Sequence, residues 1–169
     1  LPEQARRAGV VTASAGNHGL GVARAAWLLG MPATVVVSET ASQAKVDALR
    51  HSGAELSVHG QTYDDAEAEA IRLAAQRALH FVSAYNNAAV VAGGGTIALE
   101  IFEDLASVRT LVVPAGGGGL IGGIGVAAHG REPAVVVYGA QSVASPALHA
   151  ALVAGGIVSV GVQPSLADG

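Results

Sequence analysis

The residues TLVVPAGGGGLIGGIGVAAHG, at positions 110–130, combine a β-branched run, four consecutive glycines and a second apolar run, with no Asp, Glu, Lys or Arg. A charge-free stretch of this length can cross a membrane as a helix. Pro114 and the glycines would interrupt such a helix and leave backbone groups unpaired in lipid. The stretch therefore predicts a strand, a glycine-rich turn and a helix, in a protein that does not cross a membrane.

Short β-branched runs and alanine-rich segments also alternate over the rest of the chain. Each β-branched run is typical of a buried strand, and the segments between them, apart from the uncharged one at 120–128, carry their charges on one face, as surface helices do. We expect strands at 9–12, 33–37, 54–58, 81–83, 111–113 and 135–138, and helices at 21–29, 43–51, 63–79, 97–105 and 120–128. This order predicts an α/β fold, with parallel sheets flanked by helices.

The composition excludes several classes of protein. Of the 169 residues, 51% are hydrophobic and 13% are charged, which does not suit a disordered chain. The absence of cysteine excludes a disulfide scaffold and suits a cytoplasmic protein. Nine basic residues scattered along a chain of net charge −4 offer no surface for nucleic acid.

The four glycines, Gly116, Gly117, Gly118 and Gly119, lie between an expected strand and an expected helix. Each costs about 0.5–1 kcal/mol in ordering relative to alanine, so the run should have a compensating role. The usual role is a nest of backbone N–H groups around a phosphate, at the positive end of a helix. The alternative is close packing of helix on strand through small residues.

Part of this run also fits a dinucleotide fingerprint, because Gly117, Gly119 and Gly122 match G-x-G-x-x-G after a strand. That fingerprint requires an acidic residue near the end of the next strand to bind the ribose. The strand expected at 135–138 is followed by Gly139, Ala140 and Gln141 instead. A phosphate site is therefore favoured over a nicotinamide-binding Rossmann domain.

A second loop, ASAGNHG at 13–19, follows the first expected strand and begins a helix. Ligands of open parallel sheets bind beyond the carboxyl ends of strands, and free N–H groups at a helix start attract anions. Asn17 and His18 are expected to point outward. The alternative is that Ser14 or Asn17 only caps the helix.

A third glycine run, GGGT at 93–96, lies in the least periodic part of the chain, 84–95. We expect this run to begin the helix of 97–105, with Thr96 either capping that helix or touching a ligand. A boundary between two lobes is expected in the same part of the chain.

Together these motifs resemble the threonine/serine dehydratase (threonine ammonia-lyase) family of fold type II pyridoxal-phosphate enzymes. The resemblance covers about residues 9–156 and depends on the order and separation of several motifs. These are SAGNHG at 14–19, MP at 31–32, AKVD at 44–47, GAE at 53–55, AGGGTIALE at 92–100 and the four glycines. It implies two lobes, a small one over 1–85 and part of a large cofactor-binding one over 86–169, incomplete at both ends.

The resemblance also implies a role for each matched residue. Gly116, Gly117, Gly118 and Gly119 would bind the phosphate of pyridoxal 5′-phosphate, and Asn17 would lie against its 3′ oxygen. The carboxylate of a β-hydroxy amino acid would be bound by Ser14, Gly16, Asn17 and His18. The reaction implied is α,β-elimination from L-threonine or L-serine, which gives a 2-oxo acid and ammonia, in a homo-oligomer.

The chain departs from the family pattern at the lysine that holds the cofactor. The family's Schiff-base lysine precedes the S-x-G-N-H loop and would lie upstream of Leu1, and the sole lysine, Lys45, is expected on a surface helix. The chain by itself should therefore hold no catalytic residue and be inactive. The alternative is a non-catalytic phosphate-ligand-binding fragment or pseudoenzyme.

Three further positions refine the expected chemistry. Ala15 stands where racemising members tend to have a second serine, which favours elimination over racemisation. Gln141 and Ala147 stand where some members have carboxylates that help to hold a divalent cation. One neutral carbonyl oxygen is a poor ligand set for a hard cation, so no metal site is expected.

Overall fold

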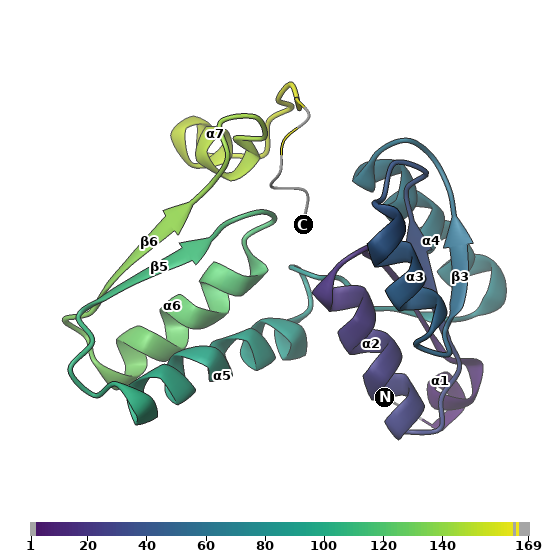
Figure 1. Ribbon diagram of the computed structural model, residues 1–169, viewed down its shortest axis with the longest axis horizontal. Coiled ribbons are helices and arrows are strands. Elements are labelled where there is room, and N and C mark those ends of the chain that lie inside the picture. The colour runs from purple at the N-terminus through teal and green to yellow at the C-terminus, as the bar shows by residue number, and fades with distance from the viewer. Residues whose placement is uncertain (1–2, 164, 166–169) are drawn as a thin grey trace. The chain divides into compact units, whose positions relative to one another are not determined.

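The structure is a computed structural model that describes residues 3–163 and 165. The chain divides into two compact units, residues 1–84 and 85–169, coloured from purple to teal and from teal to yellow in Figure 1. Each unit contains a parallel sheet with helices packed on it. The expected α/β fold with parallel sheets is thus confirmed.

The first unit is built on a four-stranded parallel sheet of order β3-β2-β1-β4. Its strands are β1 Val10–Ala13, β2 Ala33–Val37, β3 Glu55–Val58 and β4 His80–Phe81, and its helices are α1 Glu3–Ala8, α2 Asn17–Leu28, α3 Gln43–Arg50 and α4 Tyr63–Arg77. Strand β4 is shorter than expected, because only Val10 and Val11 pair with it.

The two faces of this sheet bury different side chains, as the alternation along a strand requires. One face packs against α4, through Val11, Ala13, Val36, Ala66, Ala70 and Leu73. The other face packs against α2 and α3, through Ala23, Val35, Val37, Val46 and Leu49. Strand β1 is buried along its whole length, which places the loop that follows it on a rigid support.

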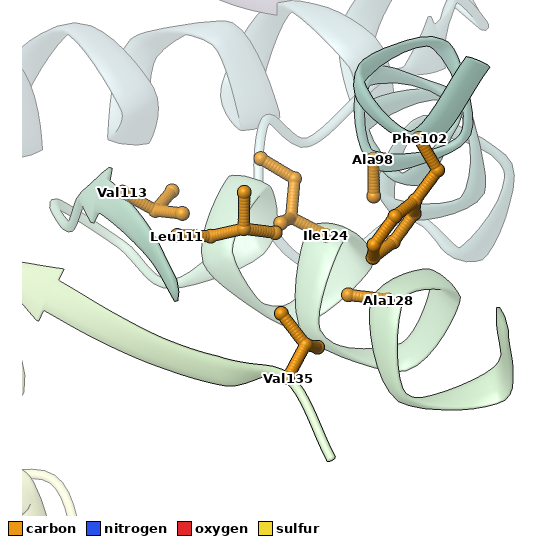
Figure 2. Close-up of a cluster of buried hydrophobic side chains, with 7 residues drawn as sticks. All are labelled: Ala98, Phe102, Leu111, Val113, Ile124, Ala128 and Val135. Carbon is orange, nitrogen blue, oxygen red and sulfur yellow. The ribbon is translucent and has the colours of Figure 1, made fainter. Parts of the chain in front are cut away.

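The second unit contains α5 Ala88–Asp104, β5 Thr110–Pro114, α6 Gly119–Arg131, β6 Val136–Ala140 and α7 Ala147–Ala154. Strands β5 and β6 pair in parallel from Thr110 beside Val136 to Pro114 beside Ala140. Helices α5 and α6 run side by side (Figure 1). They share a core with the sheet, in which the ring of Phe102 is directed toward Ala128 (Figure 2).

The contact between α5 and α6 corrects the interpretation of the third glycine run. Helix α5 begins at Ala88, where the Oδ1 atom of Asn87 accepts hydrogen bonds from the amides of Ala89 and Val90 at 3.0 and 3.2 Å. The expectation that this run begins the helix was wrong. The glycines lie inside α5, and Thr96 is not a cap, since its hydroxyl donates to the carbonyl of Gly93 at 2.8 Å.

Close approach of the two helices explains the glycine at position 95 of α5. A Cβ atom on Gly95 would lie 2.9 Å from the carbonyl oxygen of Gly123. A Cβ atom on Gly123 would lie only 2.1 Å from the carbonyl oxygen of Val91. The packing of backbone against backbone therefore overrides the low helix propensity of glycine.

Candidate functional site

The loop after β1 holds its shape with its own serine. The Oγ atom of Ser14 accepts a hydrogen bond from the amide of Gly16 at 3.1 Å, and α2 begins at Asn17 with Gly16 as its N-cap and no side-chain cap bond. Neither Ser14 nor Asn17 therefore caps the helix. Among the described residues, the amides of Asn17, His18 and Gly19 have no hydrogen-bond acceptor. This helix start thus offers donors to an anion.

His18 points into the unit, so the expectation that its side chain faces outward was wrong. Its Nε2 atom lies 2.9 Å from the Oγ1 atom of Thr12 and 3.1 Å from the carbonyl oxygen of Val82. The Thr12 hydroxyl donates its single hydrogen to the same carbonyl at 2.7 Å. Nε2 therefore faces two acceptors and must carry the proton. Asn17, in contrast, is exposed.

The electrostatics of His18 suit a neutral ring. Burial lowers the pKa of His18 below its usual value, and the hydrogen bond to the carbonyl of Val82 raises the pKa less than burial lowers it. The ring is therefore neutral at neutral pH, with Nε2 protonated. His18 can tie the loop to β1 and to the residue after β4, but its side chain brings no positive charge to the loop.

The neutral state of His18 predicts a pH-dependent stability. The unfolded chain binds a proton at His18 below about pH 6.5, whereas the folded chain does so only at lower pH. The free energy of unfolding should therefore decrease as the pH falls below about 6.5. Urea denaturation between about pH 7.5 and pH 5.5 measures this decrease. The variant His18→Gln, which keeps an amide donor but does not titrate, should show a smaller decrease, and equal decreases in both proteins would contradict the assignment.

The four glycines lie at the carboxyl end of β5 and at the start of α6. Strand β5 ends at Pro114, and α6 begins at Gly119 with Gly118 as its N-cap, in the left-handed region at φ 91°. No hydrogen bond within the described part of the chain starts at the amides of Gly116, Gly117, Gly118 or Gly119. Four neighbouring N–H groups at the start of a 13-residue helix are thus left for a ligand.

The space around the loop is shaped by the absence of side chains. A Cβ atom on Gly117 would lie 2.6 Å from the Cδ1 atom of the Tyr85 ring, so the backbone at this position sits directly against that ring. A phosphate needs several convergent donors and a backbone that it can approach closely. The loop offers four neighbouring amides without an acceptor among the described residues, and its glycines carry no side chains that would cover the backbone.

Other residues that the sequence singled out lie outside the two loops. Lys45 lies in α3 and is partly buried. Within residues 3–163 and 165, no group of three or more His, Asp or Glu side chains could hold a metal ion. None of the helices described has the length and apolar composition needed to span a bilayer. The side-chain amide of Gln141 donates a hydrogen bond to the carbonyl of Ala115 at the start of residues 115–119, the glycine loop, and no pattern in the sequence indicated this contact.

Comparison with known proteins identifies the family. Residues 2–169 match the family model described as pyridoxal-phosphate dependent enzyme. The chain belongs to this family. The resemblance to threonine/serine dehydratases is confirmed, and the cofactor of the family is pyridoxal 5′-phosphate, as that resemblance implied.

Relatives within the family carry the names that the motifs suggest. The chain is 44% identical to an L-threonine ammonia-lyase of Thermotoga maritima over 100% of its own length and 42% of that protein. It is also 44% identical to an L-threonine ammonia-lyase of Geobacter sulfurreducens over 99% of its length and 42% of that protein. The chain thus spans less than half the length of these relatives.

Solved structures of the family have the same fold. The processed form of threonine deaminase isoform 2 from Solanum lycopersicum is similar at a TM-score of 0.88 and 32% identity, over 99% of this chain and 49% of that one. Maize serine racemase is similar at a TM-score of 0.90 and 29% identity, over 99% of this chain and 51% of that one.

Proposed function

We propose that this chain is the central part of a pyridoxal-phosphate-dependent L-threonine or L-serine ammonia-lyase. The observation that carries the proposal is the glycine loop, whose four amides lack an acceptor among the described residues at the start of α6. The 44% identity to two L-threonine ammonia-lyases supports a β-hydroxy amino acid as the substrate. We further propose that the unit of residues 1–84 is the small lobe and that the unit of 85–169 is part of the large, cofactor-binding lobe.

The glycine loop would hold the phosphate of the cofactor. Gly116, Gly117, Gly118 and Gly119 would donate their amide hydrogens to its oxygens, and the positive end of α6 would add to the attraction. When bound, pyridoxal phosphate supplies an electron sink for the negative charge that develops at the Cα atom of the substrate. The protein's own task in this loop is to place the phosphate and to keep it in place.

The loop after β1 would bind the carboxylate of the substrate, through Ser14, Gly16, Asn17 and His18. The Oγ atom of Ser14 accepts a bond from Gly16, but its hydroxyl hydrogen remains able to donate. Since the His18 ring is held neutral and turned inward, His18 would contribute its backbone amide. Asn17 is exposed, and its side-chain amide would lie against the 3′ oxygen of the cofactor.

The reaction would be the conversion of L-threonine or L-serine to a 2-oxo acid and ammonia. Elimination of the β-hydroxyl as water precedes the release of the amino group as ammonia, and the water consumed in that release balances the water lost. Ala15 presents a methyl group, which cannot return a proton to Cα, so elimination is favoured over racemisation. The active form would be a cytoplasmic homo-oligomer.

Replacing Asn17 by alanine tests the proposal in the full-length protein. The full-length protein without the substitution, called the parent below, should release ammonia and a 2-oxo acid from L-threonine or L-serine, with little D-serine formed. If Asn17 orients the cofactor, Asn17→Ala should lower kcat by about tenfold while KM changes less, because the lost contact is felt mainly in the transition state. Steady-state kinetics measure both constants.

The outcomes separate the candidate functions. An unchanged kcat with a raised KM would mean that Asn17 binds the substrate equally in the ground state and in the transition state. Cofactor binding without turnover of any β-hydroxy amino acid would favour the non-catalytic alternative. Rapid formation of D-serine by the parent would show that another group returns a proton to the Cα atom, which Ala15 cannot do.

A further inference from the structure

The side chain of Gln141 connects the glycine loop to helix α7, which follows Gln141 in the sequence. Its Nε2 atom donates a hydrogen bond to the carbonyl oxygen of Ala115 at 2.9 Å. Its Oε1 atom accepts a hydrogen bond from the backbone amide of His149 at 3.0 Å. Both ends of one side-chain amide are therefore used, one on each segment.

The bond to His149 replaces a missing helix cap. The N-cap of α7 is Pro146, whose side chain has no acceptor, and no side-chain cap bond is made there. His149 is the third residue of α7, the position whose amide an N-cap side chain ordinarily satisfies. The Oε1 atom of Gln141 therefore caps the N-terminus of α7, as the side chain of an N-cap serine or aspartate does at other helices.

The bond to Ala115 determines the direction of the first donor of the loop. The carbonyl of Ala115 and the amide of Gly116 belong to one planar trans peptide, in which C=O and N–H point in opposite directions. Holding this carbonyl toward Gln141 therefore aims the Gly116 N–H away from Gln141. The amide of Ala115 is held as well, by the carbonyl of Ala140 at 2.8 Å.

The rest of the loop has few other restraints. Its glycines carry no side chains, and their amides make no hydrogen bond within the described residues. The Tyr85 ring beside Gly117 and the Leu148 side chain, 3.7 Å from a Cβ built on Gly118, limit it only by contact. Leu148 belongs to α7, so the helix capped by Gln141 also lies against the loop.

We infer that Gln141 is a positioning residue that aims the first amide of the glycine loop and ties that loop to α7. The inference deepens the proposed function, since it assumes that the loop binds the cofactor's phosphate. Gln141 does not touch the phosphate in this arrangement. It acts through the peptide of Ala115 and Gly116 on one side and through α7 on the other.

Two variants in the full-length protein separate the two halves of this link. Gln141→Glu keeps an acceptor for the His149 amide but replaces the donor to Ala115 with a carboxylate that repels the carbonyl. Gln141→Ala removes both bonds. The control is His149→Ala, which keeps the backbone amide that Gln141 binds.

The measurements are the affinity of the apoprotein for pyridoxal phosphate and the hydrogen exchange of a peptide containing His149. The loss of one hydrogen bond to the loop should weaken cofactor binding about fivefold in Gln141→Ala, and more in Gln141→Glu. Exchange in α7 should become faster in Gln141→Ala but stay slow in Gln141→Glu. His149→Ala should match the parent in both measurements. General destabilisation would not separate affinity from exchange in this way.

The results distinguish failure of the inference from failure of the proposed function. If the parent binds pyridoxal phosphate and both Gln141 variants bind it equally well, Gln141 does not position the loop. If exchange in α7 is the same in Gln141→Ala, in Gln141→Glu and in the parent, the link to α7 is overturned. If the parent does not bind the cofactor, the proposed function fails, and the exchange of α7 still decides whether Gln141 caps that helix.

Discussion

Replacing Gly123 by alanine should destabilise the unit of residues 85–169 by about 3 kcal/mol, the upper part of the usual range for overpacking. The added Cβ atom would lie 2.1 Å from the carbonyl oxygen of Val91 and 2.9 Å from the amide nitrogen of Gly95. Both are backbone atoms, so no side chain can turn away and the two helices must separate. That separation would open the core around Phe102. Urea denaturation followed by far-UV circular dichroism measures the loss of stability.

Neighbouring glycines of α6 provide the controls. A Cβ atom on Gly122 or on Gly125 would meet nothing within 4 Å. Alanine at either position should leave stability unchanged or raise it by about 0.5–1 kcal/mol, because alanine favours the helix over glycine. If Gly122→Ala were as destabilising as Gly123→Ala, helix contact would not be the reason for glycine at position 123.

Replacing Gly117 by alanine should weaken cofactor binding by about tenfold or more in the full-length protein. The added Cβ atom would lie 2.6 Å from Cδ1 and 2.9 Å from Cγ of the Tyr85 ring. These atoms lie near the base of the ring, so the loop must move or the whole ring must be displaced. Displacement of the loop would misalign the amides proposed to bind the phosphate, and donors out of line lose most of their strength. Titration of the apoprotein with pyridoxal phosphate measures the effect.

A double variant tests whether the ring is the cause. In Gly117→Ala with Tyr85→Ala, the space taken by the ring is available to the new methyl group, so part of the lost affinity should return. Tyr85→Ala alone gives the reference for this double-mutant cycle. Losses that simply add in the double variant would mean that the ring does not set the position of the loop.

The strands and the two loops after them could be predicted from the sequence because they depend on short patterns. A buried parallel strand is a short β-branched run, and the loop at its carboxyl end follows directly. All six expected strands are present, although β4 ends two residues early, at Phe81. Helices α1 and α7 were not predicted, since α1 has only six residues and α7 has neither charges nor a side-chain cap of its own.

The errors concern contacts between residues far apart in the sequence. Glycines at 93–95 are typical of a turn, yet they lie inside α5, where the approach of α6 leaves no room for a side chain at Gly95. In the sequence His18 is typical of an exposed loop residue, but in the structure its Nε2 atom contacts Thr12 and Val82. The two hydrogen bonds of Gln141 likewise depend on where α7 and the glycine loop lie in space. No local pattern carries that information.

The two loops differ in when they can form as the chain folds. The glycine loop lies between consecutive elements, and the Ala115 carbonyl is bound by a residue only 26 positions away. The inward position of the His18 ring, in the loop at 14–19, depends on Val82, which is 70 positions from Thr12. Closing this longer segment costs about 1 kcal/mol more in chain entropy. During synthesis from the N-terminus, the earlier loop must therefore wait for Val82 before His18 can find both of its acceptors. Val82 is made before Gly116 and Gln141, so the loop at 14–19 can still reach its final shape before the glycine loop does.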